Sequence, residues 1–295
     1  MRERLFIILS AALLSVFVFT SCSPDLNSSA PDVKTKKLTY YNADGSVKYI
    51  KVTEYDSSGK ESKYSSYSDA DTLSYYYTYE YDSSGNQTKF TEYSADGTVS
   101  SYTQYTYDLN NNVTSRADYN SSETCNYKIT YEYSSKNLLT KKNYYSDGST
   151  LSSYTVYEYN KKGKEIKRTT QSIDDEEDIE LEEYYDSEYD SKWNLIKCKR
   201  YDYVGDLCDY EAYEYDSNNN NTKYTSYNSS DAAQLGYVYE YNTNNKCVKR
   251  YTYYRTTLKY ITTTTYNSYG YITGTNTLTA AGVQDYCEVY EYTYY

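Results

Sequence analysis

The sequence predicts an all-β protein made of tandem β-hairpins, a long antiparallel meander that coils into a spiral ribbon or partly closes. A short tyrosine motif recurs, as "YEYDSSGN" at 79–86, "YEYNKKGK" at 157–164 and "YEYDSNNN" at 213–220. Composition points the same way, because 49 of the 295 residues are tyrosine, against 1 tryptophan and 4 phenylalanines. Tyrosine has a high strand propensity and stacks well across neighbouring strands.

The tyrosine that closes each copy of the motif defines the repeat. Neighbouring closing tyrosines lie 26 residues apart, except for one interval of 30 and one of 25. The closing tyrosines are Tyr55, Tyr81, Tyr107, Tyr133, Tyr159, Tyr189, Tyr215, Tyr241, Tyr266 and Tyr292. A fixed period of this kind marks an array of one supersecondary unit. Residues 37–295 are therefore expected to form one repeat domain.

Each unit contains two turn signals, such as "DSSGN" at 82–86 and "SADGT" at 94–98. Aspartate, asparagine, serine and glycine supply the hydrogen bonds and the positive φ angles that tight turns need. Between the turns, tyrosine, threonine and valine alternate with a period of two, which is typical of strands. No segment favours a helix. Proline is absent after Pro31, as expected where most backbone N–H groups pair in a sheet.

Alternation assigns two faces to the strand that enters the motif. The odd-numbered residues from Leu73 to Tyr81 form one face, which we expect to be the packing face. The other face carries Tyr76, Thr78 and Glu80, and a glutamate recurs at the place of Glu80 in most units. This second face is expected to be the wetter one.

The first residues indicate export. Arg2 and Arg4 precede an apolar stretch that ends in "FTSC" at 19–22, so residues 1–21 are interpreted as a signal peptide. Thr20 and Ser21 before Cys22 resemble the lipobox of bacterial lipoproteins, which implies that Cys22 is lipidated and becomes the mature N-terminus. The residue at 19 is phenylalanine where the family usually has leucine. The alternative is an ordinary cleaved secretory signal with an incidental cysteine.

Residues 22–36 are predicted to be a flexible tether. The segment is polar, lacks an apolar period and contains both prolines of the chain. The predicted organisation is therefore a signal peptide at 1–21, a tether at 22–36 and the tyrosine-rich hairpin domain at 37–295.

The motif and its spacing resemble the YD repeats of RHS-type bacterial surface and toxin proteins. The resemblance covers most of residues 37–295 and depends on tyrosine, aspartate and Gly-Asn together, as in "YEYDSSGN". It implies a long hairpin array that coils into a shell or spiral, and in some members an association with carbohydrate. The units here are longer than the usual ones. A weaker likeness is to the hairpin repeats of the MORN type.

Charge and composition argue against several function classes. The chain has 42 acidic and 30 basic residues and a net charge of −12, so its field repels a phosphate backbone and nucleic acid is not an expected partner. It has no histidine, which removes the commonest general base and the usual non-thiolate zinc ligand. Glutamates recur in almost every unit, which fits a structural role better than a single catalytic pair. We expect no enzyme activity, no metal site and no cofactor.

Two acidic features have competing interpretations. The segment "SIDDEEDIELEE" at 172–183 carries the extra residues of the longest unit, and we interpret it as a solvated acidic turn rather than a cation-binding or docking loop. Asp108, Asn110 and Asn112 imitate the first half of a calcium loop, but turn chemistry explains their spacing more simply.

Five cysteines follow Cys22, an odd number that cannot pair completely within the chain. Cys198 and Cys208 flank one mid-unit turn, so their spacing is compatible with a cross-strand disulfide. Half-filled apolar positions explain them equally well.

A candidate ligand surface lies on the glutamate face, five positions before the closing tyrosine. Tyrosines occupy this place in five units, at Tyr76, Tyr102, Tyr154, Tyr184 and Tyr210. Equivalent rings two strands apart would repeat every ~10 Å, comparable to a disaccharide. The alternative is that the rings only pack against other parts of the protein.

The sequence therefore predicts an exported, lipid-anchored protein of the cell envelope, at the outer membrane or cell surface. Its predicted role is non-enzymatic binding or adhesion, with a polysaccharide or another envelope component as the partner. The alternative is a structural envelope protein without a specific ligand.

Overall fold

The computed structural model describes residues 32–68, 71–173 and 179–295, and in these ranges all helical or extended secondary structure is β-strand. The strands are β1 Val33–Asn42, β2 Val47–Tyr55, β3 Glu61–Ser68, β4 Thr72–Tyr81, β5 Gln87–Ser94, β6 Val99–Tyr107, β7 Val113–Asn120, β8 Cys125–Tyr133, β9 Leu139–Tyr145, β10 Leu151–Tyr159, β11 Glu165–Ile173, β12 Ile179–Tyr189, β13 Leu195–Asp202, β14 Leu207–Tyr215, β15 Asn221–Asn228, β16 Ala233–Tyr241, β17 Cys247–Tyr254, β18 Thr257–Tyr266, β19 Ile272–Thr279 and β20 Gln284–Tyr294.

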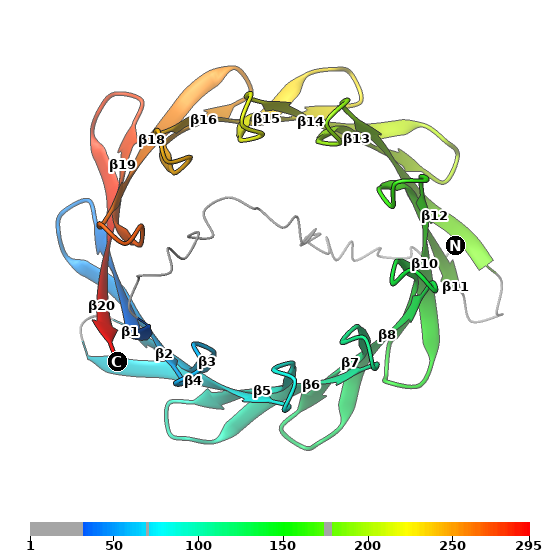
Figure 1. Cartoon of the computed structure of the whole chain (residues 1–295), viewed down its shortest axis with the longest axis horizontal. Helices are drawn as coiled ribbons and strands as arrows, with labels where there is room; N and C mark the ends of the chain where they lie inside the picture. The colour runs from blue at the N-terminus through cyan, green and yellow to red at the C-terminus, as the bar shows by residue number, and fades with distance from the viewer. Residues whose placement is uncertain (1–31, 69–70, 174–178) are drawn as a thin grey trace, which may run out of the picture.

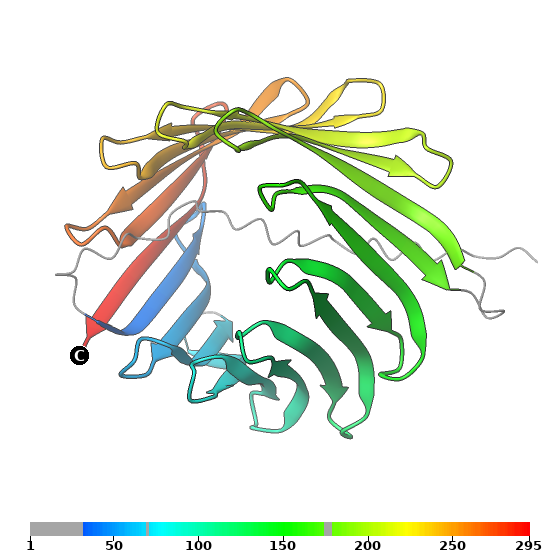
Figure 2. The same cartoon turned by 45° about the vertical axis from the view of Figure 1, so that its right-hand side comes forward.

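The strands form one closed barrel. Each strand pairs antiparallel with the next along the chain, as β4 does with β5, and β1 pairs antiparallel with β20. Figure 1 shows the resulting ring, and Figure 2 shows its strands running obliquely around it. The prediction of an all-β hairpin array is confirmed. The sheet closes completely and leaves no open spiral.

Closure removes the two free edges of the sheet. The seam between β1 and β20 joins nine residue pairs, among them Lys36 with Tyr292 and Tyr40 with Glu288. An unpaired edge would expose a row of backbone donors and acceptors to other chains. The seam also explains why β1 begins at Val33, four residues before the predicted domain boundary, because residues 33–36 already pair with β20.

The turn that follows the motif is held by an aspartate or asparagine in most units, and by Ser134 in the unit closed by Tyr133. The carboxylate of Asp82 accepts hydrogen bonds from the backbone N–H groups of Ser84 and Asn86 at 2.9 and 2.8 Å. The turn needs a positive φ angle at its fourth residue, which is 88° at Gly85 and 63° at Asn111. Glycine and asparagine adopt this conformation most readily, which explains their place in the motif.

The calcium-like series at 108–112 is a turn of the same kind. The carboxylate of Asp108 accepts from the N–H groups of Asn110 and Asn112, both at 2.8 Å. Hydrogen bonds from the side chain and backbone of Asn112 lower the pKa of Asp108. Over the described residues, no group of three or more histidine, cysteine, aspartate or glutamate side chains is arranged to hold a metal ion. The acidic residues 174–178 lie outside the described residues.

Neighbouring turns are also joined to each other around one rim. The side-chain amide of Asn86 donates to the amide oxygen of Asn111 at 2.9 Å, and Asn220 donates in the same way to Asn245 at 3.0 Å. These residues lie 25 positions apart, so each bond connects the turn of one unit to the turn of the next. The asparagines in the motif therefore contribute to the ring as well as to their own turn.

The face that carries the closing tyrosines lines the inside of the barrel. Residues of this face from six consecutive strands, β15 to β20, line one shared cavity, which only the concave side of a curved sheet allows. The glutamate face therefore points outward, and Glu80 is exposed as predicted.

Among the described residues, no second layer of secondary structure packs on the predicted packing face. Buried residues are mostly small polar side chains near mid-strand, such as Thr103, Thr155 and Thr277, whereas Ile50 and Ile129 are among the few buried aliphatic ones. The sheet is therefore a single layer, and its stability depends on the closed hydrogen-bond network and on contacts between neighbouring side chains.

Nine of the ten closing tyrosines fix their strand to the preceding one. The hydroxyl of Tyr81 donates to the backbone carbonyl of Glu61 at 2.8 Å, and the hydroxyl of Tyr107 donates to that of Gln87 at 2.7 Å. The same bond forms at Tyr133, Tyr159, Tyr189, Tyr215, Tyr241, Tyr266 and Tyr292. This bond explains why the motif closes on tyrosine, since phenylalanine has no hydroxyl to donate.

Replacing one of these hydroxyls should weaken the fold measurably. We expect Tyr107→Phe to lower the free energy of unfolding by about 1 kcal/mol, the usual value of one hydrogen bond. Urea unfolding followed by circular dichroism measures this change. Tyr105→Phe, on the same strand and face, is the control and should have a smaller effect. An equal loss in both variants would contradict the role of the closing hydroxyl.

Candidate binding surfaces inside and outside the barrel

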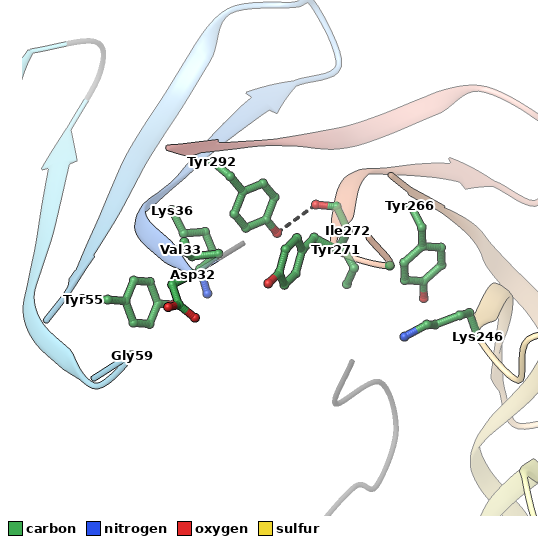
Figure 3. A pocket seen from close by; sticks show the side chains of 11 residues that line it. Asp32, Val33, Lys36, Tyr55, Gly59, Lys246, Tyr266, Tyr271, Ile272 and Tyr292 are labelled. Atoms are coloured by element: carbon green, nitrogen blue, oxygen red, sulfur yellow. Dashed lines mark hydrogen bonds between the residues drawn. The ribbon is translucent and has the colours of Figure 1, made fainter. Parts of the chain in front are cut away.

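A first cavity lies inside the barrel beside the seam between β1 and β20. It encloses about 360 Å³ and is lined by Tyr55, Tyr266, Tyr271 and Tyr292 together with charged groups that include Lys36. Figure 3 shows the rings of Tyr55 and Tyr266 on opposite sides of this space, with Tyr271 and Tyr292 between them. The repeat thus brings three closing tyrosines from separate units to one place.

A second and larger cavity adjoins the first. It encloses about 560 Å³ along the inner wall from β15 to β20, and both cavities include Tyr266 and Ile272 in their lining. Its lining includes a phenol from Tyr239, a guanidinium from Arg250 and a carboxylate from Glu288. The two cavities form one continuous tyrosine-lined surface, which we call the inner site.

The inner site also carries polar and charged groups. Nε of Arg250 is buried and has no hydrogen-bond partner within the described part of the chain. The carboxylate of Glu288 accepts from the hydroxyl of Thr275 at 2.7 Å. Burial raises the pKa of Tyr239 to about 12. Its phenol is neutral at physiological pH and can donate a hydrogen bond. The site therefore offers a cation, a carboxylate and neutral phenols.

Elsewhere the inner wall carries charges that neutralise each other. Arg116 pairs with Asp118 at 3.0 Å, and Arg200 lies 3.4 Å from Glu183 and also pairs with Asp209. The sequence reasoning missed this charged wall. The sequence does contain a signal for this wall, because alternation places these charges on the same face as the closing tyrosines.

The five predicted ligand-binding tyrosines lie on the outer face. Tyr76 is enclosed on both sides of its ring, by Nζ of Lys63 at 4.9 Å from the ring centroid and by the ring of Tyr93 at 4.6 Å. Tyr102, Tyr184 and Tyr210 are enclosed in the same way, and Lys141 covers Tyr154 at 4.3 Å.

We call the place five residues before the closing tyrosine the ladder position, and the row of these places on the outer face the outer ladder. The contacts above define a Lys–Tyr–Tyr stack, in which a tyrosine at the ladder position lies between a lysine and a second tyrosine. The stack covers both faces of the ladder ring. That these tyrosines bind a glycan stays a prediction.

The cysteines and the N-terminus complete the predicted sites. Cys198 and Cys208 are both free thiols. Cys198 pairs with Glu211 on the inner face, whereas Cys208 is the extra residue at a register shift between the pairs Arg200–Asp209 and Tyr201–Leu207. Cys208 therefore does not lie opposite Cys198 across the hairpin. Cys22 lies outside the described residues, and across those residues no helix is long and apolar enough to cross a bilayer.

Comparison with known proteins gives only distant likenesses. No family model and no curated protein matches the chain. A solved structure of the Tc holotoxin pore of Photorhabdus luminescens is similar at 12% identity and a TM-score of 0.34, over 83% of this chain and 16% of the toxin chain. A Tc toxin is thus among the structural neighbours.

Two porin-like proteins are also similar. The one from Bacteroides uniformis has 12% identity and a TM-score of 0.38, over 88% of this chain and 98% of the other. The one from Bacteroides vulgatus has 12% identity and a TM-score of 0.32, over 73% and 93%. At these values the similarities assign neither a family nor an activity to the chain.

Proposed function

We propose that this protein is an exported, non-enzymatic binding protein of the cell envelope that holds a glycan segment against the inner site of the barrel. The observation that carries the proposal is the cavity of about 560 Å³ lined by Tyr239, Arg250 and Glu288. Its volume lies within the range of about 300–1,000 Å³ that is typical of ligand sites. The competing proposal is a structural envelope protein without a ligand.

The chemistry of the inner site favours a hydroxyl-rich ligand. Aromatic rings bury the flat faces of sugar rings, and a few convergent polar groups fix their orientation. Arg250 can donate to a sugar oxygen and Glu288 can accept from a sugar hydroxyl. The opposite charges of these two groups also suit a neutral ligand better than a strongly charged one.

The outer face favours a barrel that stands in water. Lys199 pairs with Glu188 at 2.6 Å and Lys223 with Glu214 at 2.7 Å, and both pairs point outward. A lipid-facing wall needs an apolar band about 25 Å tall, and a lysine at its centre costs about 2–4 kcal/mol. We therefore propose that the membrane is reached through a lipid on Cys22 rather than through the barrel wall.

Binding to the inner site is tested with one charge-removing substitution. We expect Arg250→Gln to weaken glycan binding about tenfold or more, because hydrogen bonds to charged groups contribute about 1.5–3 kcal/mol. Glycan-array screening followed by calorimetry with the best glycan measures this effect. The matched control is Arg116→Gln, which removes an arginine from the same wall outside the cavity and should leave binding unchanged.

A second pair of substitutions compares the two faces. Tyr102→Ala combined with Tyr154→Ala removes two rings of the outer ladder and should not change binding if the ligand lies inside. Weaker binding in this double variant, together with unchanged binding in Arg250→Gln, would assign the ligand to the outer ladder. Absence of any glycan signal in the folded parent would favour the purely structural role.

Anchoring is tested separately. If Cys22 is acylated, a palmitate analogue should label the protein in its host, and Cys22→Ser should release it from membranes. Cys125→Ser, which removes a different free thiol, is the control and should stay membrane-bound. Unlabelled protein whose membrane association survives Cys22→Ser would exclude the lipid anchor.

A further inference from the structure

One unit has a gap in the outer ladder. The ladder position holds tyrosine in five units, but in the unit closed by Tyr241 it holds Gly236. The other four units have Ile50, Lys128, Ile261 and Cys287 there, so Gly236 alone has no side chain.

Both walls of the Lys–Tyr–Tyr stack remain at this gap. Lys223 precedes its closing tyrosine by 18 residues, as Lys63 precedes Tyr81. Tyr253 pairs with Gly236 across the sheet, as Tyr93 pairs with Tyr76. In the units with a ladder tyrosine, the lysine lies 4.0–4.9 Å from the ring centroid. In four of these five units the ring of a second tyrosine lies at 4.6–4.8 Å, and Tyr154 pairs with Gln171 instead.

The gap coincides with a cavity of about 240 Å³, which we call the Gly236 slot. Its lining includes Lys223, Thr225, Tyr227, Gly236 and Tyr253, and Gly236 is buried at its base. Lys223 has no ladder ring to cover and forms an ion pair with Glu214 at 2.7 Å. The slot therefore keeps the cation and the ring that enclose a tyrosine elsewhere, without the tyrosine.

The backbone at the slot would accept a side chain. A Cβ atom at Gly236 would lie 3.6 Å from the carbonyl oxygen of Tyr224, 3.6 Å from Cβ of Tyr253 and 3.8 Å from Oγ1 of Thr225, all ordinary contacts. Gly236→Tyr is therefore expected to restore the ladder and to fold, since glycine inside a strand is less favourable than a residue with a side chain.

We propose that the Gly236 slot binds a phenolic ring, which takes the place of the missing ladder tyrosine. A cation is attracted to the face of a π system, and tyrosine stacks on another aromatic ring. A saturated sugar ring has no π face for Lys223. This site lies on the outer face, is separate from the inner site and does not depend on the proposed function.

The test uses p-cresol, which has the same ring as the tyrosine side chain. Titration followed by NMR should show saturable binding to the parent and none to Gly236→Tyr, where the new ring fills the slot. The matched control is Lys128→Tyr, which adds a tyrosine at the ladder position of another unit and should bind p-cresol like the parent. Lys223→Gln should weaken binding about two- to fivefold, as expected for an exposed cation–π contact.

Several results would overturn the proposal. Absence of binding to the parent would mean that Tyr253 itself covers Gly236. Equal binding to the folded Gly236→Tyr variant, or equal binding of 4-methylcyclohexanol and p-cresol to the parent, would exclude a slot that recognises an aromatic ring. If Gly236→Tyr does not fold, Tyr253→Ala removes one wall of the slot instead. Unchanged p-cresol binding in that variant would also overturn the proposal.

The same ring can belong to a small molecule or to a tyrosine of a second copy, and sedimentation separates these sources. Self-association that the parent shows and Gly236→Tyr lacks would assign the ring to a second copy. Monomers in both, with p-cresol bound by the parent alone, would assign it to a free phenol.

Discussion

Raising the pH from about 9 to about 12 should unfold the barrel in one cooperative step, because inner tyrosines hold their protons more tightly in the folded chain. Burial raises the pKa of seven tyrosines to about 12, at Tyr55, Tyr77, Tyr79, Tyr131, Tyr159, Tyr239 and Tyr292. In an unfolded chain the pKa of tyrosine is about 10.

The sign of the effect follows from these two values. Below the unfolded pKa both states are protonated, so the stability that these tyrosines contribute is fully present. Between about 10 and 12 the unfolded chain loses protons that the folded chain keeps, so the free energy of unfolding falls as the pH rises. Solvent screening reduces the contribution of each partly exposed ring, but seven rings act together.

Circular dichroism and phenolate absorbance, recorded in one pH titration, measure this prediction. We expect the loss of strand signal and the appearance of phenolate to coincide, and the strand signal to return at neutral pH. Phenolate that appears near the ordinary pKa while the strands stay intact would contradict the structural role of the inner tyrosines.

Deleting half of one unit should prevent folding, whereas deleting a whole unit should not. Removal of residues 82–107 takes away β5 and β6, leaves 20 − 2 = 18 strands and joins Tyr81 to Asp108, which restores the Tyr-Asp junction of the motif. Removal of residues 82–94 takes away β5 alone and leaves 20 − 1 = 19 strands. Neighbours in a closed antiparallel ring must alternate in direction, which an odd number of strands cannot satisfy.

Soluble yield, circular dichroism and size-exclusion chromatography distinguish the two deletions. The 18-stranded chain should be folded and monomeric like the parent. The 19-stranded chain should leave β1 and β20 unpaired and should aggregate through these free edges. Soluble, strand-rich and monomeric protein from both deletions would mean that closure of the ring is not needed for folding.

Much of the fold could be predicted from local signals. The motif places Tyr81 at a strand end and Asp82 in a turn, and alternation correctly separates Tyr79 and Tyr81 from Glu80. Closure could not be predicted in this way, since it depends on the accumulated twist and tilt of 20 strands. The pairing of Lys36 with Tyr292 joins residues from opposite ends of the domain, and no local pattern encodes it.

The candidate sites, like the fold, have features that the sequence predicts and features that it does not. The sequence predicts the outer face for Tyr76, but not that Lys63 and Tyr93 enclose its ring. A usable signal existed, because Tyr93 follows its closing tyrosine by 12 residues and the same spacing recurs at Tyr119 and Tyr253. The inner site offered no such signal. Arg250 and Glu288 meet only because the sheet curves, and curvature is a property of the whole ring.

The closed seam makes the position of the chain ends arbitrary. The backbone N–H of Tyr295 donates to the carbonyl of Asp32 at 3.2 Å, so the end of the last strand lies beside the start of the first. A short linker between these residues would therefore make a circular permutant, and the chain could be opened at the hairpin turn of any unit. Since all units pair alike, a permutant opened at 82–86 should build the same ring with its ends elsewhere.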